Sequence, residues 1–183
     1  MRNVHQRRFP VPAAHAAPLL DRLASADDVF WPDESWPKMR LDRPLGVGAA
    51  GGHGPIRYSV TAYEPGRRIE FTFAPVTRLR GTHTLTVEDG VEPEGEGACV
   101  IRHVIEGRPF GLMVCGWPLV FRWLHDALLE DALDNAEEAL TGRVLAPARW
   151  SPWVRFLRAR MASRRRPAAV PRAPGAALPH GKG

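Results

Sequence analysis

The chain has few of the residues that would point to several common protein classes. It contains two cysteines, Cys99 and Cys115, and two lysines among 183 residues. The cysteines lack metal-type spacing, so we expect two buried thiols rather than a disulfide. No apolar run approaches the roughly 18 residues that a membrane-spanning helix needs. The N-terminal sequence MRNVHQRRFP is charged and has no apolar stretch behind it. It does not resemble a signal peptide, and we therefore expect a cytoplasmic protein.

Acidic residues are absent from the C-terminal part of the chain. The formal net charge is +5, from 25 basic and 20 acidic residues. Ten of the basic residues lie from Arg143 onward, where there is no Asp or Glu, which leaves 15 basic against 20 acidic residues in the body. The high isoelectric point is therefore a property of the tail. It does not indicate that the fold itself binds nucleic acid.

The middle of the chain alternates between apolar and polar residues, as half-buried strands do. In residues 54–73 the alternation runs on both sides of the sequence Glu64-Pro65-Gly66, which favours a turn and predicts a hairpin. Residues 82–88 and 98–106 predict a second hairpin, joined by the acidic, glycine-rich residues 89–97. A first strand is expected over residues 4–11 and a short helix over 13–24. The glycine-rich stretch 45–54 lacks the residues of a phosphate-binding loop.

One long amphipathic helix follows these strands, from Pro118 to Leu140. Acidic and basic residues fall on one of its faces. The other face is apolar and carries Trp117, Phe121, Leu124, Leu128, Ala132 and Ala139. A single long helix after a meander of strands must lie across the sheet, and such a pair of layers favours an internal cavity and hence a ligand.

Gly142 suits the C-terminal end of that helix and predicts a boundary. We expect one domain over residues 1–142 and an arginine- and proline-rich extension over 143–183. Within the extension, Ser151-Pro152 favours the start of a short helix at about 151–165, and disorder is expected beyond it.

Three segments resemble the START-like SRPBCC superfamily, which includes polyketide cyclases and dehydratases, plant Bet v 1 proteins and many bacterial members. They are FPVPAAHAAPLLDRLA at 9–24, GPIRYSVTAYEPGRRIEFTF at 54–73 and WPLVFRWLHDALLEDALDNAEEAL at 117–140. The resemblance covers about residues 3–141. It implies an α+β, helix-grip fold, in which a curved antiparallel sheet wraps round the long C-terminal helix. It also implies a cavity that takes hydrophobic or aromatic small molecules, without specifying a function.

Two histidines are the candidate catalytic residues. His83 shares its strand face with Leu85 and Val87, and His103 shares its face with Ile101 and Ile105. If the hairpin is centred near residue 93, the two histidines lie directly opposite each other. Each would then lower the pKa of the other, and a neutral imidazole can act as a general base. The alternative is that both are hydrogen-bonded polar residues lining a pocket.

Apolar residues of the strands and the helix are the candidate ligand contacts, together with one tyrosine whose hydroxyl can orient a ligand. They are Tyr58, Ile56, Val60, Phe71, Phe73, Leu85, Ile101, Phe121, Leu124 and Leu128. A metal site would need to recruit His53 or His125, and neither spacing matches a metal motif, so no metal and no cofactor are expected. Trp31 and Trp36 favour either a lid or a loop pinned by its tryptophans.

Three functions remain open from the sequence. The leading hypothesis is a binding or carrier protein for a small hydrophobic or aromatic molecule. The alternative is a polyketide cyclase- or dehydratase-type enzyme that uses His83 and His103 as acid and base. A peripheral membrane or partner-binding module is the third, because Trp150, Trp153 and Phe156 lie among the arginines of the extension, where they suit weak contact with anionic lipid or nucleic acid.

Overall fold

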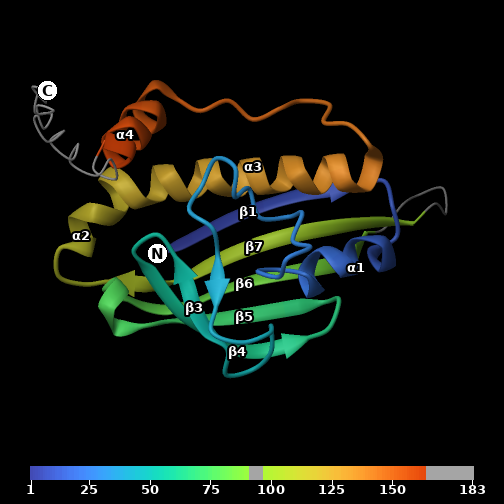
Figure 1. Cartoon of the computed structure of the whole chain (residues 1–183), viewed down its shortest axis with the longest axis horizontal. Coiled ribbons are helices and arrows are strands. Elements are labelled where there is room, and N and C mark those ends of the chain that lie inside the picture. The colour runs from blue at the N-terminus through green and yellow to red at the C-terminus, as the bar shows by residue number, and fades with distance from the viewer. Residues whose placement is uncertain (91–96, 164–183) are drawn as a thin grey trace, which may run out of the picture.

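The computed structural model describes residues 1–90 and 97–163 (Figure 1). Seven strands form one antiparallel sheet in the order β1-β7-β6-β5-β4-β3-β2. The strands are β1 (Arg2–Phe9), β2 (Arg40–Leu41), β3 (Ala50–His53), β4 (Ile56–Glu64), β5 (Arg68–Phe73), β6 (Leu79–Gly90) and β7 (Ala98–Pro109). The helices are α1 (Ala13–Asp21), the 3-10 turn η1 (Pro75–Thr77), α2 (Met113–Gly116), the π-helical turn η2 (Trp117–Phe121), α3 (Arg122–Thr141) and α4 (Pro152–Ser163). This order confirms the predicted α+β architecture.

The first predicted hairpin is confirmed as β4 and β5. Its turn falls at Glu64–Arg67, where the Arg67 N–H donates to the Glu64 carbonyl at 3.0 Å. Gly66 takes a φ of 70° there, in the left-handed region that favours glycine. The buried face of the hairpin includes Tyr58, Val60 and Phe71. The apolar alternation therefore identified the side of the sheet that faces the helix.

The register predicted for the second hairpin is wrong by two residues. His83 pairs with Ile105, and His103 pairs with Leu85, so the two histidines are diagonal rather than directly opposite neighbours. The strands also extend further than expected, because β6 begins at Leu79 and β7 ends at Pro109. Because side chains alternate with a period of two, a shift of two residues keeps both histidines on the inner face.

The long helix is longer than predicted and is not uniform. Helical structure is continuous from Met113 to Thr141 through α2, η2 and α3. The π-helical turn contains Pro118, which has no N–H to donate and whose ring would crowd an α-helical turn. Gly142 ends α3 with a φ of 76°, and its N–H donates to the Glu138 carbonyl at 2.8 Å. The predicted C-cap glycine is therefore confirmed.

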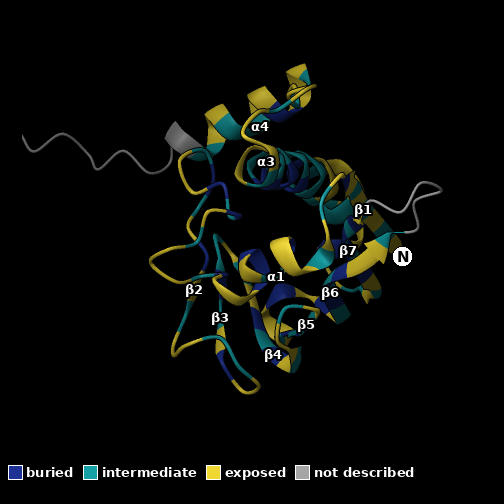
Figure 2. Ribbon diagram, turned by 90° about the vertical axis from the view of Figure 1, so that its right-hand side faces the viewer, coloured by how far each residue is buried: buried dark blue, intermediate teal, exposed yellow. Residues whose placement is uncertain are grey.

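The buried face of α3 differs at one end from the predicted apolar face. Leu124, Leu128 and Ala132 are buried as expected. Ala139 is exposed, whereas Leu129, Leu133 and Ala136, which follow one another at spacings of four and three, are buried. In Figure 2 the buried residues of α3 face the sheet.

The main core lies at the α1 end of the sheet. Phe9, Leu20, Ile69, Ile101 and Leu133 are almost fully buried there, between α1, the sheet and the C-terminal half of α3. Cys99 is buried in the same cluster, whereas Cys115 is exposed, so the prediction of two buried thiols is wrong for Cys115. It lies on the outer side of α2, which the sequence did not predict as a helix.

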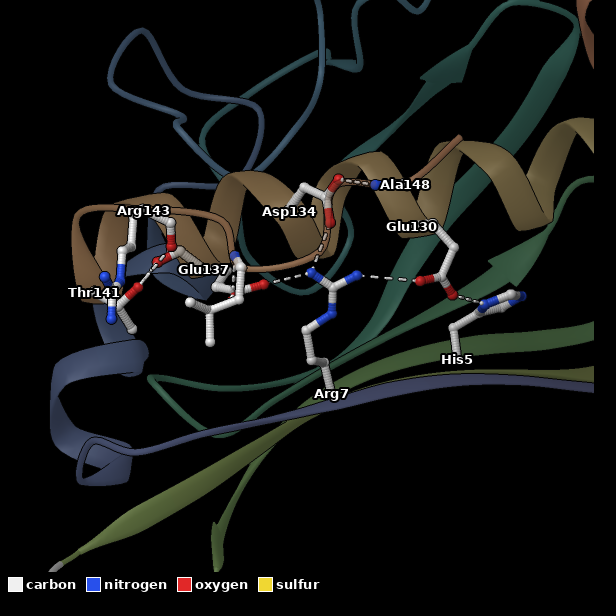
Figure 3. A network of polar contacts seen from close by, with 9 residues as sticks. His5, Arg7, Glu130, Asp134, Glu137, Thr141, Arg143 and Ala148 are labelled. Carbon is white, nitrogen blue, oxygen red and sulfur yellow. Dashed lines mark hydrogen bonds and ion pairs between the residues drawn. The ribbon is translucent and has the colours of Figure 1, made fainter. Parts of the chain in front are cut away.

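Strand β1 has a polar inner face, and acidic residues of α3 cover it (Figure 3). Arg7 donates to Asp134 at 2.6 Å, Glu137 at 2.9 Å and Glu130 at 3.2 Å. His5 contacts Glu130 at 2.9 Å and Asp126 at 3.0 Å. The spacing fits because two strand residues advance about 6.6 Å and four helical residues about 6.0 Å. The charged face of the helix is therefore not a solvated surface.

Part of the extension packs on the same helix. Val154 is buried against Leu124, Leu128 and Leu129, and the Trp150 indole donates to the Asp131 carboxylate at 2.9 Å. Helix α4 lies within the range predicted for it. The predicted disorder beyond Pro167 falls outside the described residues. Among the described residues, no helix is both long enough and apolar enough to cross a membrane.

We predict that Arg7→Ala lowers the free energy of unfolding by about 2–4 kcal/mol, because it removes the cation that contacts the partly buried carboxylates of Asp134 and Glu137 and one of the two that contact Glu130. Urea unfolding followed by circular dichroism measures this. The control is Arg2→Ala, which removes an ion pair to Glu106 whose side chains are 62% and 64% exposed. Such a pair contributes at most about 1 kcal/mol. Equal effects of the two substitutions would contradict the prediction.

Candidate functional site

A cavity of about 350 Å³ lies between the sheet and the N-terminal half of α3. Its walls come from β4, β5, β6 and β7 on one side and from η2 and α3 on the other, and the loop of residues 30–39 borders it. The walls are mostly apolar. Among the described residues that line the cavity there is no lysine, arginine, aspartate or glutamate. Apart from tryptophan indoles, the polar side chains of the lining are those of four histidines and Tyr58. A ligand of this cavity would therefore meet apolar surface and neutral hydrogen-bonding groups.

Most of the residues predicted to contact a ligand line this cavity. They are Ile56, Tyr58, Phe71, Phe73, Leu85, Phe121, Leu124 and Leu128, together with His83 and His103. Val60 and Ile101 do not line it. Both are buried in the main core near α1, because the strands run past the end of the cavity.

A row of rings crosses the sheet beneath the cavity, with one ring from each of six neighbouring strands. In sheet order they are His5 on β1, His103 on β7, His83 on β6, Phe71 on β5, Tyr58 on β4 and His53 on β3. The rings of Phe71 and His83 stack, with centroids 4.6 Å apart. Tyr58 meets the edge of His83 at 4.8 Å. From α3, His125 lies 5.0 Å from His103 between ring centroids. Five of the chain's seven histidines thus gather in one place.

The two candidate catalytic histidines contact each other. Nδ1 of His83 lies 3.2 Å from Nε2 of His103, so one ring donates a hydrogen bond to the other. Nε2 of His83 and Nδ1 of His103 are buried and have no hydrogen-bond partner among residues 1–90 and 97–163. A neutral imidazole has one donor and one acceptor. Whichever ring donates, the pair is therefore left with one free donor and one free acceptor.

Burial keeps these imidazoles neutral. It lowers the pKa of His83 and of His103 well below the ordinary value of 6.5, and the neighbouring histidines lower it further. Burial also lowers the pKa of His53 to about 3, and it lowers the pKa of His125. His5 behaves differently: although burial opposes the change, its hydrogen bonds to Asp126 and Glu130 raise its pKa. The positive charge therefore lies at the wall and not in the cavity.

Among the described residues, one set of side chains could hold a metal ion. Ligand atoms of His5, His125 and Asp126 all lie within 4.8 Å of one another. His5 and Asp126 already bond to each other at 3.0 Å, however, and the Arg122 guanidinium lies 3.6 Å from the same carboxylate. A protonated His5 between two carboxylates accounts for these contacts. Among the described residues, neither buried nitrogen of His125 has a partner within hydrogen-bond distance, although Nδ1 lies 3.8 Å from the Asp126 carboxylate; His125 is therefore a further polar group beside the cavity.

Two tryptophans border the cavity. The Trp36 indole is buried and donates to Asp131 on α3 at 2.7 Å, and the Trp31 indole donates to the Pro37 carbonyl at 3.2 Å. The guanidinium of Arg158, from α4, lies over the Trp36 ring at 4.5 Å. These two tryptophans therefore hold the loop of residues 30–39 in place, and Arg158 of α4 contacts it from the outer side.

A larger groove of about 930 Å³ lies on the outer side of α3. Its lining includes Asp28, Asp33, Asp134 and Glu138, and it contains none of the histidines. The groove is more open and more acidic than the histidine cavity, whose lining is mostly apolar. The histidine cavity is therefore the better candidate site.

The sequence analysis identified His83, His103 and Tyr58 as candidate site residues. It considered His125 only as a possible metal ligand and did not identify His5. His125 lies four residues after Phe121 and three before Leu128, which is the spacing of one helix face. That spacing was sufficient to place it at the cavity. His5 follows the strand alternation with Arg7, but nothing in the sequence shows that carboxylates of α3 lie opposite them.

Neither protein-family models nor curated protein sequences match the chain. Solved structures do. A protein from Thermobifida fusca matches with a TM-score of 0.55 at 16% identity, over 82% of this chain and 99% of that one. A point mutant of norcoclaurine synthase from Thalictrum flavum, in complex with a transition-state analogue, matches with a TM-score of 0.55 at 13% identity, over 78% and 94%. CalU16 from Micromonospora echinospora matches with a TM-score of 0.51 at 14% identity, over 88% and 83%.

The chain has a helix-grip fold. The predicted resemblance to START-like SRPBCC proteins is thereby confirmed for the fold. At these identities the matches carry no residue-level correspondence, so the chemistry of this helix-grip protein must be argued from its own cavity.

We predict that the protein loses stability as the pH falls below about 6.5, because the unfolded chain then binds protons that the buried histidines do not. Each fully neutral histidine contributes up to about 1.4 kcal/mol per pH unit below its unfolded pKa. His83→Phe, which keeps a ring between Phe71 and Phe73, should reduce the slope. Urea unfolding from pH 7.5 to 5 measures it, with the exposed His15→Phe as control. Identical slopes in the wild type and His83→Phe would contradict the prediction.

Proposed function

We propose that the protein binds a small hydrophobic or aromatic molecule that carries a hydroxyl or carbonyl group. The observation that supports this most strongly is the cavity of about 350 Å³, lined by apolar side chains and neutral histidines. Ligand pockets typically occupy about 300–1,000 Å³ and combine apolar walls with a few polar groups. The cavity supports a binding or carrier protein, and the free cysteines Cys99 and Cys115 are consistent with a cytoplasmic one.

The unpartnered histidine nitrogens support a polar group on the ligand. A buried polar atom without a hydrogen bond costs about 1–3 kcal/mol, and the histidine pair contains two such atoms. A hydroxyl group can satisfy both, because it donates and accepts. A purely aliphatic ligand would leave both nitrogens unsatisfied. The pair therefore favours a phenol, an enol or a hydroxylated ring over a plain hydrocarbon.

We predict that Leu124→Trp weakens binding of the fluorescent probe N-phenyl-1-naphthylamine. The indole fills cavity space next to Leu128 and competes with the probe, and a loss of 1.4 kcal/mol weakens binding about tenfold. The control is Leu119→Trp, the same substitution on the outer side of η2, where Leu119 is exposed. It should bind the probe as the wild type does.

Native mass spectrometry of the wild type, purified from its own host, completes this test. A co-purifying small molecule that is absent from Leu124→Trp supports the proposal. If the wild type carries no ligand and both variants bind the probe equally, the cavity is not a binding site.

A second candidate function is acid–base catalysis on the bound molecule. The specific observation is the 3.2 Å contact between His83 and His103. One free nitrogen can accept a proton from an acidic carbon while the hydrogen bond between the rings reorganises and the other ring releases a proton at its own free nitrogen. Tyr58 lies against the ring of His83, and burial raises the pKa of Tyr58, so its hydroxyl stays protonated and can donate to a ligand oxygen.

We predict that the wild type, but not His103→Leu, exchanges an acidic C–H of its co-purified ligand with deuterium when placed in D₂O. Both proteins should still carry the ligand. Mass spectrometry of the released ligand measures the exchange. Equal exchange rates in the two proteins would remove the catalytic alternative and leave the binding proposal standing.

A further inference from the structure

One end of the molecule exposes many large apolar side chains. They are Val76 on η1, Leu112 and Val114 at α2, Leu119 on η2, Trp123 on α3, and Trp153 and Phe156 on α4. We call this set the apolar end. Leu112 is 78% exposed and Val76 72%. Single exposed apolar residues are ordinary, but a group of this kind at one end of a molecule marks a contact surface.

Contacts between the segments show that the apolar end is continuous. The Phe110 N–H donates to the Arg78 carbonyl at 3.0 Å, which joins the start of α2 to η1. The Trp153 indole donates to the Leu119 carbonyl at 2.9 Å, which joins α4 to η2. Figure 1 shows α2 and α4 at the same end of the fold. Three segments far apart in the sequence therefore present one surface.

The helical segment at the centre of this surface is apolar on both sides. Trp117, Val120 and Phe121 line the cavity, whereas Leu119 and Trp123 face outward. A helix in contact with the core on one side and water on the other normally carries polar residues on the outside. Helix α4 shows the same departure, because Val154 is buried while Trp153 and Phe156 are exposed.

The charged residues of the segments that form the apolar end are basic, and of them Arg122 lies 3.6 Å from the carboxylate of Asp126, just outside these segments. Segments 71–87, 107–125 and 143–163 contain no Asp or Glu. Exposed arginines border the apolar residues: Arg78 and Arg80 on the η1–β6 side, Arg108 on β7, Arg122 on α3 and Arg155 on α4. The body as a whole is net acidic, so this concentration of basic residues is a local feature.

We propose that the apolar end docks on anionic lipid membranes. Exposed Trp and Leu side chains with flanking arginines are what the boundary between headgroups and acyl chains accommodates. Nucleic acid would engage the arginines and the aromatic rings, but it gives no favourable site to exposed aliphatic side chains such as Val76, Leu112 and Leu119. The proposal does not depend on what the cavity binds.

Vesicle co-sedimentation of the full-length protein tests this, using phosphatidylcholine vesicles with and without phosphatidylglycerol. Leu112→Gln/Leu119→Gln should weaken binding to the anionic vesicles about tenfold, through lost apolar burial. The matched control is Leu145→Gln, since Leu145 is 72% exposed and lies beyond the other end of α3. Arg80→Gln/Arg108→Gln should weaken binding to anionic vesicles and reduce its salt dependence. The arginine-rich tail is the same in every variant.

Three results would overturn the proposal. One is equal vesicle binding by the wild type and Leu112→Gln/Leu119→Gln. Another is a dimer of the wild type, in analytical ultracentrifugation, that the double variant dissociates, which would assign the surface to a second copy of the chain. The third is an affinity for single-stranded oligonucleotides that falls with the double variant while vesicle binding stays unchanged. Thermal unfolding of each variant confirms that the fold is retained.

Discussion

The polar seam between β1 and α3 is the interaction on which the rest of the structure depends. Asn3, His5 and Arg7 point inward from an edge strand, where a hydrophobic helix could not cover them. The helix meets them with carboxylates, so it is held along one edge of the sheet by directional contacts instead of by close apolar packing alone. Apolar packing fills the α1 end of the space beneath α3, and the space at its N-terminal half remains open as the cavity.

The seam also fixes where charge can reside. His5 gains a proton between Asp126 and Glu130, and the nearby histidines of the cavity remain neutral as a result of burial and of mutual repulsion between their charged forms. A cavity next to a charged wall is thus kept free of charge. Its polar atoms are hydrogen-bonding groups whose partners are incomplete, and this combination favours a neutral ligand with one polar group over an ionic one.

Features set by local pattern were predictable, and features set by the meeting of distant segments were not. The β4–β5 hairpin follows from alternation and from the turn residues Glu64 to Gly66, and Gly142 ends α3 as its αL conformation requires. The alternation of side chains along each strand is enough to place His83 and His103 on the inner face of the sheet. Their register does not follow from that alternation, because it depends on how the connection between β6 and β7 is built. The partners of the α3 carboxylates were not predictable either, since acidic residues four apart look the same whether water or Arg7 lies opposite.

The π-helical turn at Trp117–Phe121 has a consequence for how this chain tolerates change in length. Such a turn is one extra residue accommodated within an α-helix. Each residue of an α-helix advances the side chains by about 100°, so removing one residue from the turn would rotate α2 relative to α3 by that angle. Either the carboxylates of α3 would lose their contacts with β1 and His125 would leave the cavity, or Met113 would leave its buried position on the sheet. The π-helical turn thus sets the angle about the helix axis between the buried side of α2 and the buried side of α3. The length of this short segment is therefore under stricter constraint than the identity of its residues.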